Sequence, residues 1–88
     1  MALFLVVERF KSGREGDIHA RFVRDGRLMP EGVAYRGSWI DAAGTRCFQI
    51  VEAADRERVD AWTARWSDLI DFDVVPVVEP NAYWARYR

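Results

Sequence analysis

The sequence predicts an α+β domain whose elements follow the order β-α-β-β-α-β. Three observations predict it: apolar runs with alternating faces begin and end the body of the chain, a hairpin lies in the middle, and amphipathic helical stretches separate these strands. Right-handed crossovers turn this order into the ferredoxin-like arrangement, a four-stranded antiparallel sheet with two helices on one face. We expect residues 1–88 to form a single such domain, with 80–88 as a C-terminal tail.

The first strand and the first helix are delimited by simple signals. Ala2–Phe10 is apolar on both alternating faces, which predicts a strand. A helix should begin near Asp17, although Ser12 and Glu15 have the spacing of a capping box. It should end at Gly26, because glycine takes the left-handed closing conformation without strain.

The middle of the chain predicts a hairpin. The strands are Val33–Asp41 and Thr45–Ala53, joined by a type I turn with Gly44 at a positive-φ position. A two-residue loop would shift every cross-strand pair by one residue. With the longer turn, the expected pairs are Asp41 with Thr45, Trp39 with Cys47, Gly37 with Gln49, and Tyr35 with Val51.

A second helix and a fourth strand complete the fold. Asp55 is a good N-cap, and the helix should run to Asp71. The run Phe72–Glu79 then predicts a strand, and Pro76 within it predicts an edge position or a bulge because proline cannot donate to the ladder. The buried stripe of the helix is expected to be Val59, Trp62, Trp66, Leu69 and Ile70.

The alternation predicts two sheet faces of different character. We expect the oily face of Ile40, Phe48 and Ile50 to meet the helices. The other face would then be open, and a large open apolar face usually marks an interface. We therefore expect a homodimer that packs sheet against sheet with two-fold symmetry. The open face would carry Phe4, Val6, Phe10, Tyr35, Trp39 and Val51.

Composition excludes several classes of protein. The net charge is −1 and no basic block occurs, so we expect no nucleic-acid partner; the aromatic and arginine residues of 83–88 would sooner pack on a partner subunit than stack on bases. No apolar run approaches the length that spans a bilayer, so we expect no membrane partner. The single cysteine fits a reducing compartment, and we expect a cytoplasmic protein.

Several short segments carry a resemblance to known proteins. They are Val-Val-Glu8-Arg9-Phe10, Arg27-Leu-Met-Pro30-Glu-Gly32, Ser38-Trp39, Arg46-Cys47-Phe48-Gln49 and Trp62-x-x-x-Trp66-x-Asp68-Leu69. Through them, residues 2–79 resemble a family of short bacterial proteins of unknown function that is similar in layout to the dimeric α+β barrel superfamily. The resemblance implies the fold and the dimer. Related barrels include cofactor-free monooxygenases, haem-handling enzymes, isomerases and ligand-sensing modules, but none of their catalytic motifs is matched here.

The candidate catalytic residues are Glu8 and His19. A buried Glu8 could accept a proton, or it could simply pair with an arginine, and the second reading applies more strongly to Glu52. His19 is the only histidine and could act as a general base, or it could be a structural residue at the edge of the buried face of its helix, beside Ile18 and Phe22. One histidine without companions does not make a metal site, and we expect neither a metal nor a cofactor.

The candidate ligand-binding residues are Tyr35, Trp39, Cys47 and Gln49. Aromatic walls with an amide among them are the usual lining of a pocket for a small apolar ligand. The alternative is that these side chains fill the dimer core. Cys47 has no activating motif nearby, and the adjacent Arg46 should point to the opposite face, so we expect an inert buried thiol.

These observations lead to three hypotheses. The first is a homodimeric domain that binds a small, largely apolar ligand. The second is a cofactor-free enzyme, monooxygenase-like or isomerase-like, with Glu8 or His19 as base and Trp39 or Gln49 orienting the substrate. The third is a structural or subunit-interaction protein in which residues 80–88 form an interaction arm.

Overall fold

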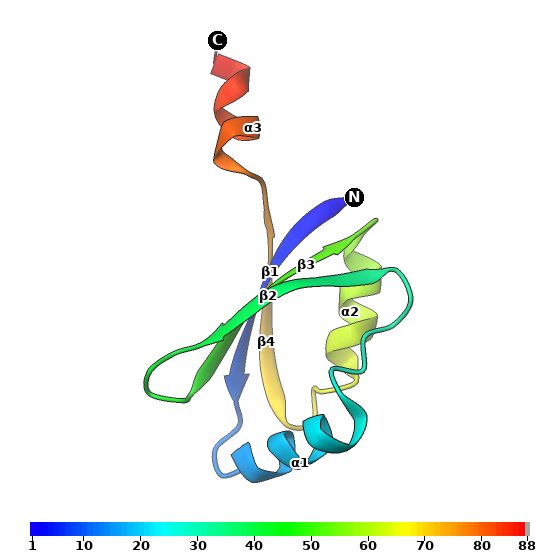
Figure 1. Cartoon of the computed structure of the whole chain (residues 1–88), viewed down its shortest axis with the longest axis vertical. Helices are drawn as coiled ribbons and strands as arrows, with labels where there is room; N and C mark the ends of the chain where they lie inside the picture. Colours follow the sequence, from blue (N-terminus) through cyan, green and yellow to red (C-terminus); the bar gives the residue numbers. More distant parts are fainter. Residues whose placement is uncertain (88) are drawn as a thin grey trace.

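The computed structural model describes residues 1–87 and confirms the α+β, ferredoxin-like order (Figure 1). One antiparallel sheet has the strand order β2-β3-β1-β4. Its strands are β1 (Ala2–Phe10), β2 (Val33–Ile40), β3 (Arg46–Ala53) and β4 (Ile70–Val77). The helices on its covered face are α1 (Glu15–Asp25) and α2 (Arg56–Ala64).

Most boundaries agree with the local signals. β1 has the predicted limits, and Gly26 ends α1 as predicted with a positive φ of 69°, although its ψ of −152° is not that of the left-handed helical conformation. α1 begins at Glu15, before the predicted start near Asp17, and its N-cap Arg14 has no side-chain cap, so the Ser12–Glu15 spacing does not give a capping box. Asp55 caps α2 as predicted, since its carboxylate accepts a hydrogen bond from the Arg58 backbone N–H at 3.1 Å.

The prediction that the second helix runs to Asp71 was wrong. α2 ends at Ala64 and the chain continues in turns, where the Trp66 N–H donates to Thr63 O at 3.0 Å and the Leu69 N–H to Trp66 O at 2.9 Å. These tighter turns keep Trp66 and Leu69 on the buried side, so the apolar stripe survives although the α-helix does not. β4 consequently starts at Ile70.

The assignment of the two sheet faces was also wrong, except at Trp39 and Ile40, which lie on the open and the covered face as predicted. Phe4, Val6 and Val51 are buried beneath the helices, with exposed fractions of 4%, 0% and 0%. The face that carries Phe48 and Ile50 is the open one. Both faces are apolar in sequence, and the larger core of tryptophans from α2 and the following turn selects the side that is covered.

The hairpin register explains part of this error. Gly44 has φ 74° in the turn, as predicted, but the loop is longer than expected and the pairs near it shift by one residue. A bulge at Arg36 restores the predicted pair of Tyr35 with Val51. Because one extra residue reverses the alternation, Tyr35 points to the covered face while Trp39 points to the open one. The observed pairs are Ser38 with Gln49, Trp39 with Phe48, and Ile40 with Cys47.

The C-terminal segment leaves the body of the domain (Figure 1). β4 is an edge strand, which accommodates Pro76 as predicted. α3 (Pro80–Trp84) and the 3-10 turn η1 (Ala85–Tyr87) project beyond the sheet, and the molecule is 49 Å long but only 17 Å thick. Arg88, the last residue of the predicted tail, lies outside the described residues.

Candidate functional site

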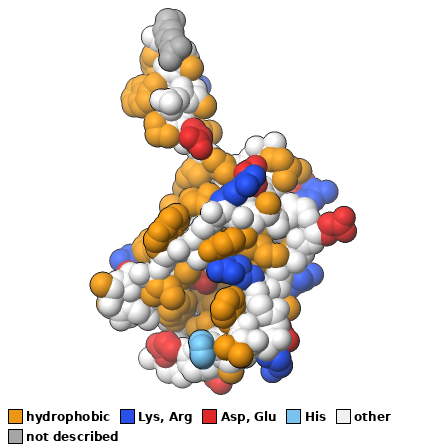
Figure 2. All heavy atoms as spheres, viewed as in Figure 1, with side chains coloured by type: hydrophobic (Ala, Val, Ile, Leu, Met, Phe, Trp, Pro, Cys, Tyr) orange, Lys and Arg blue, Asp and Glu red, His pale blue; other side chains and the backbone are white. Residues whose placement is uncertain are grey.

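A cavity of about 440 Å³ lies between α1 and the covered face of the sheet. Figure 2 shows apolar side chains gathered around this hollow, with the single histidine at its border. Its size falls within the range of small-molecule sites. The lining residues share one feature, since most are aromatic or aliphatic; the apolar ones are Phe10, Ile18, Phe22, Trp39, Ile40, Trp62, Trp66 and Ile70.

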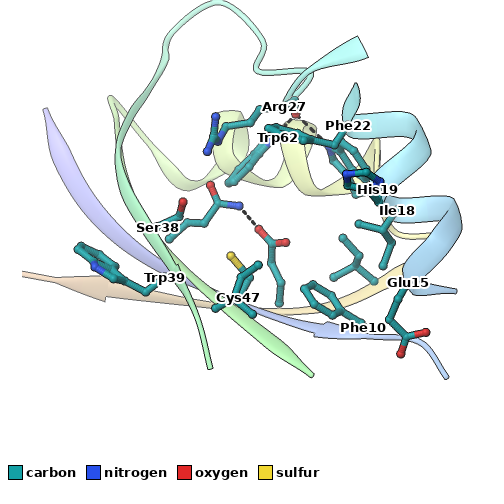
Figure 3. Close-up of a pocket in the computed structure, with 15 residues that line it drawn as sticks. Phe10, Glu15, Ile18, His19, Phe22, Arg27, Ser38, Trp39, Cys47 and Trp62 are labelled. Carbon is teal, nitrogen blue, oxygen red and sulfur yellow. Dashed lines mark hydrogen bonds between the residues drawn. The ribbon is translucent and has the colours of Figure 1, made fainter. Parts of the chain in front are cut away.

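The polar floor of the cavity is a buried pair from neighbouring strands. Glu8 on β1 and Gln49 on β3 are 6% and 7% exposed, and the Gln49 amide Nε2 donates a hydrogen bond to the Glu8 carboxylate (Figure 3). The oxygen of the same amide, Gln49 Oε1, is buried without a hydrogen-bond partner among residues 1–87. A buried acceptor left unpaired costs free energy, so this oxygen favours a bound donor group.

The ionisation of Glu8 is strongly perturbed. Burial raises the pKa of Glu8 from 4.5 to about 7, although the hydrogen bond from Gln49 and the positive charge of Arg27 oppose the rise. A carboxyl group with this pKa exchanges protons near neutral pH. The floor can therefore present either a carboxylate or a neutral acid to a ligand.

Cys47 lines the cavity beside Glu8, its cross-strand partner. Burial raises the pKa of its thiol to about 11, the nearby Glu8 adds to the rise, and Arg27 opposes it. Nucleophilic cysteines need the opposite environment, one that favours the thiolate. Cys47 is therefore part of the cavity wall and is not placed as a nucleophile.

Five of the six sequence-predicted site residues border the cavity: Glu8, His19, Trp39, Cys47 and Gln49. His19 lies on α1 at the rim, across from the floor (Figure 3). Trp39 borders the cavity, but its indole points to the other side of β2, over Gly37 (Figure 3). Tyr35 is not a lining residue; its hydroxyl hydrogen-bonds the Ser38 Oγ at 2.7 Å, and Ser38 lines the cavity.

Arg27 is a lining residue that the sequence did not reveal. It lies in the connection between α1 and β2, where its carbonyl oxygen accepts hydrogen bonds from both indole N–H groups, Trp62 Nε1 and Trp66 Nε1, at 2.9 Å each. The next residue, Leu28, has φ 58°, a conformation that non-glycine residues seldom adopt. Three-dimensional contacts thus fix the connection and aim Arg27 at the cavity.

Comparison with known families settles what this chain is related to. Residues 2–85 match a family described as a domain of unknown function (DUF3303). The chain belongs to that family. A comparison with curated proteins finds no match. The expected membership of a family of unknown function is thereby confirmed.

Two further observations on this DUF3303 chain concern membrane-spanning helices and metal ions. Within residues 1–87, no helix is long and apolar enough to cross a membrane. In the same part of the chain, no three His, Cys, Asp or Glu side chains are grouped in a way that could hold a metal ion.

Arg21 anchors α1 to the turn that follows α2. Arg21 on α1 donates two hydrogen bonds to the Asp68 carboxylate, at 2.9 and 2.7 Å, and a third to Arg65 O at 3.0 Å. Its guanidinium also lies 5.3 Å from the centre of the Trp66 ring. This two-pronged pair holds the middle of α1 beside the turn after α2 and leaves the space over Glu8 unfilled.

Proposed function

We propose that this protein is a homodimeric α+β barrel domain that binds a small, largely apolar ligand in the cavity between α1 and the sheet. The observation that carries the proposal is an apolar cavity of about 440 Å³ whose floor holds the buried Glu8–Gln49 pair with Gln49 Oε1 unpartnered. Apolar walls give affinity, and a few placed polar groups orient the ligand.

The test is a thermal-shift and calorimetric screen with small aromatic compounds, neutral and charged. Ligands that bind the folded state raise the melting temperature, and the rise grows with the logarithm of ligand concentration over Kd. A matched pair of variants locates the site: Ile18→Trp fills the cavity and should abolish binding, whereas Val23→Trp, on the exposed side of the same helix, should leave it intact. Binding that survives Ile18→Trp would contradict the proposal.

The dimer half of the proposal is supported by the open face of the sheet. Leu5 lies at its centre, between Ile50 on β3 and Val75 on β4. Two charged pairs on this face, Arg9 with Asp73 and Arg36 with Glu52, are already neutralised within the chain. An apolar centre bordered by internally paired charges suits a second copy of the same face better than a charged partner.

Sedimentation measurements test the dimer. Val75→Lys places a charge on the open face and should yield a monomer with an unchanged circular dichroism spectrum, while Val23→Lys on α1 should remain dimeric. A wild-type chain that is monomeric at high concentration would contradict this half of the proposal. Removal of residues 78–88 separates the structural alternative, because loss of the dimer in that variant would assign assembly to the C-terminal arm instead of the sheet.

A second candidate function, cofactor-free proton transfer, is favoured by the pKa of Glu8 near 7 inside the cavity. The Glu8 carboxylate would take a proton from an activated C–H of the ligand and return it to another carbon or oxygen, as in an isomerase. Exchange of such a C–H for deuterium in heavy water, lost in Glu8→Gln, would support this function. Absence of exchange in ligands that bind would remove it.

A further inference from the structure

The polar residues that α1 contributes to the cavity, Glu15 and His19, are exposed at its rim, and the other polar lining groups lie on the floor and on the side of β2. Figure 3 shows Arg27 and Ser38 on the side of β2, with Phe10 and Ile18 across the cavity toward α1. The Glu8–Gln49 pair lies on the floor. A ligand that satisfies this arrangement has a polar group at one end and an apolar body at the other.

Among the described arginines, Arg27, Arg65 and Arg86 form no salt bridge, and of these three only Arg27 lines the cavity. Arg9, Arg21 and Arg46, among others, form salt bridges with aspartates. In the part of the chain that the structure describes, no carboxylate lies within salt-bridge distance of Arg27. Its guanidinium is instead packed on aromatic rings, 3.9 Å from the centre of the Tyr35 ring and 5.3 Å from that of Phe22.

The position of Arg27 is built by the fold. Its carbonyl oxygen is held by the Trp62 and Trp66 indoles, and its side chain rests on Tyr35, whose hydroxyl in turn holds Ser38. An arginine fixed in this way loses little further conformational freedom when it binds an anion. Its planar guanidinium can donate two parallel hydrogen bonds to one carboxylate.

We propose that the ligand is a small apolar monoanion, an aromatic carboxylate, whose carboxylate binds Arg27 and whose ring lies among the apolar side chains beneath α1. This inference rests on the proposed function of the cavity and names the chemical class of its ligand. One guanidinium balances one negative charge, so a dianion such as a phosphate monoester would bring an uncompensated charge into an apolar cavity. A hydroxyl on the ring would supply the donor that Gln49 Oε1 lacks.

The charge of Glu8 is coupled to this binding. Arg27 favours the Glu8 carboxylate, and an anion that neutralises Arg27 removes that effect while repelling the carboxylate directly. Binding should therefore be tighter below about pH 7, where Glu8 is protonated, than above it. The groups that face Glu8 or share its cavity are Cys47 and Gln49 from β3, Phe72 from β4, Glu15 and His19 from α1, and Arg27.

Calorimetry with matched ligands tests the inference. The probes are benzoate and hydroxynaphthoate, each compared with its uncharged primary carboxamide. We expect the wild-type protein to bind each carboxylate at least about tenfold more tightly than its amide. Arg27→Gln should abolish this preference, Arg27→Lys should keep part of it, and Arg24→Gln should keep all of it because Arg24 pairs with Asp25 outside the cavity.

The outcomes separate this inference from the function on which it rests. Equal binding of carboxylates and amides by the wild-type protein, or a preference that survives Arg27→Gln, would overturn the anion assignment while the cavity remained a binding site. Failure of every probe to bind would remove the binding function and the anion assignment together. Repeating the titration from about pH 8 to about pH 6 should show tightening in the wild type and in His19→Gln but none in Glu8→Gln.

Discussion

The two helices cover the same face of the sheet but do different things. α2 buries Val59, Trp62 and Thr63 in the core. α1 buries none of its residues, although Ile18 packs on the edge of the core cluster. The buried side chains of α2 pack against the sheet, whereas a cavity over Glu8 lies between α1 and the sheet.

The difference teaches how an 88-residue chain can have both a core and a site. A small domain has little apolar surface to bury, so its stability concentrates where packing is tightest. α2 and the turn after it provide that packing through two tryptophans, and the same tryptophans hold the Arg27 carbonyl at the edge of the cavity. The packed half of the molecule thus positions the groups of the unpacked half.

The largest expected effect is a loss of stability when the packing beneath α2 is disrupted. Trp62→Ala should lower the free energy of unfolding by about 3–5 kcal/mol, because it opens a large void and removes a hydrogen bond to Arg27 O. Phe22→Ala on α1, where the ring is 42% exposed, should cost about 1 kcal/mol or less. Urea denaturation measures both values. Similar losses in the two variants would show that α1 is packed as firmly as α2.

The second prediction concerns the floor of the cavity. Because folding raises the pKa of Glu8 from 4.5 to about 7, the folded state binds the proton more tightly, and stability should fall as pH rises through that window. The loss should reach roughly 3 kcal/mol and should be absent in Glu8→Gln. Urea denaturation at about pH 5 and about pH 8 measures it. An equal pH dependence in both proteins would assign the effect to other carboxylates.

The third prediction uses the cysteine as a probe of the unpacked side. Because Cys47 is buried and the pKa of its thiol is raised to about 11, the thiol should react with a disulfide reagent at least about tenfold more slowly in the folded protein than in urea. Bound ligand should slow the reaction further. Rapid labelling of the folded protein would mean that the cavity side opens freely to solvent.

The smallest expected effect is on stability and comes from substitutions at the N-caps of the two helices. Asp55→Ala removes the side-chain cap of α2 and should cost about 1 kcal/mol of stability. Arg14→Ala at the start of α1 removes no cap and should cost a few tenths of a kcal/mol, mainly from its exposed pair with Asp17. Thermal unfolding of both variants measures the difference, and a larger loss in Arg14→Ala would reverse the comparison.

The sequence predicted the fold because its signals are local. Alternation in Ala2–Phe10, the cap at Asp55 and the proline in the last strand each follow from the chemistry of a few neighbouring residues. The covered face could not be assigned in this way, since both faces are apolar and the bulge at Arg36 reverses the alternation within β2.

The site was predicted in part for the same reason. Glu8, Cys47 and Gln49 stand out as polar residues in apolar strands, and alternation places them on one face together. Arg27 lies in a connection, and nothing local distinguishes it from the other arginines. Its place at the cavity depends on hydrogen bonds from Trp62 and Trp66, residues 35 and 39 positions away.

The most direct test of the cavity is a titration of the isotopically labelled protein with hydroxynaphthoate, followed by two-dimensional NMR. The account predicts saturable shifts of the backbone signals of α1, of Glu8 and Gln49, and of the Arg27 connection, with signals of the open face around Leu5 and Val75 unchanged. Shifts confined to the open face, or no shifts at millimolar ligand, would contradict it.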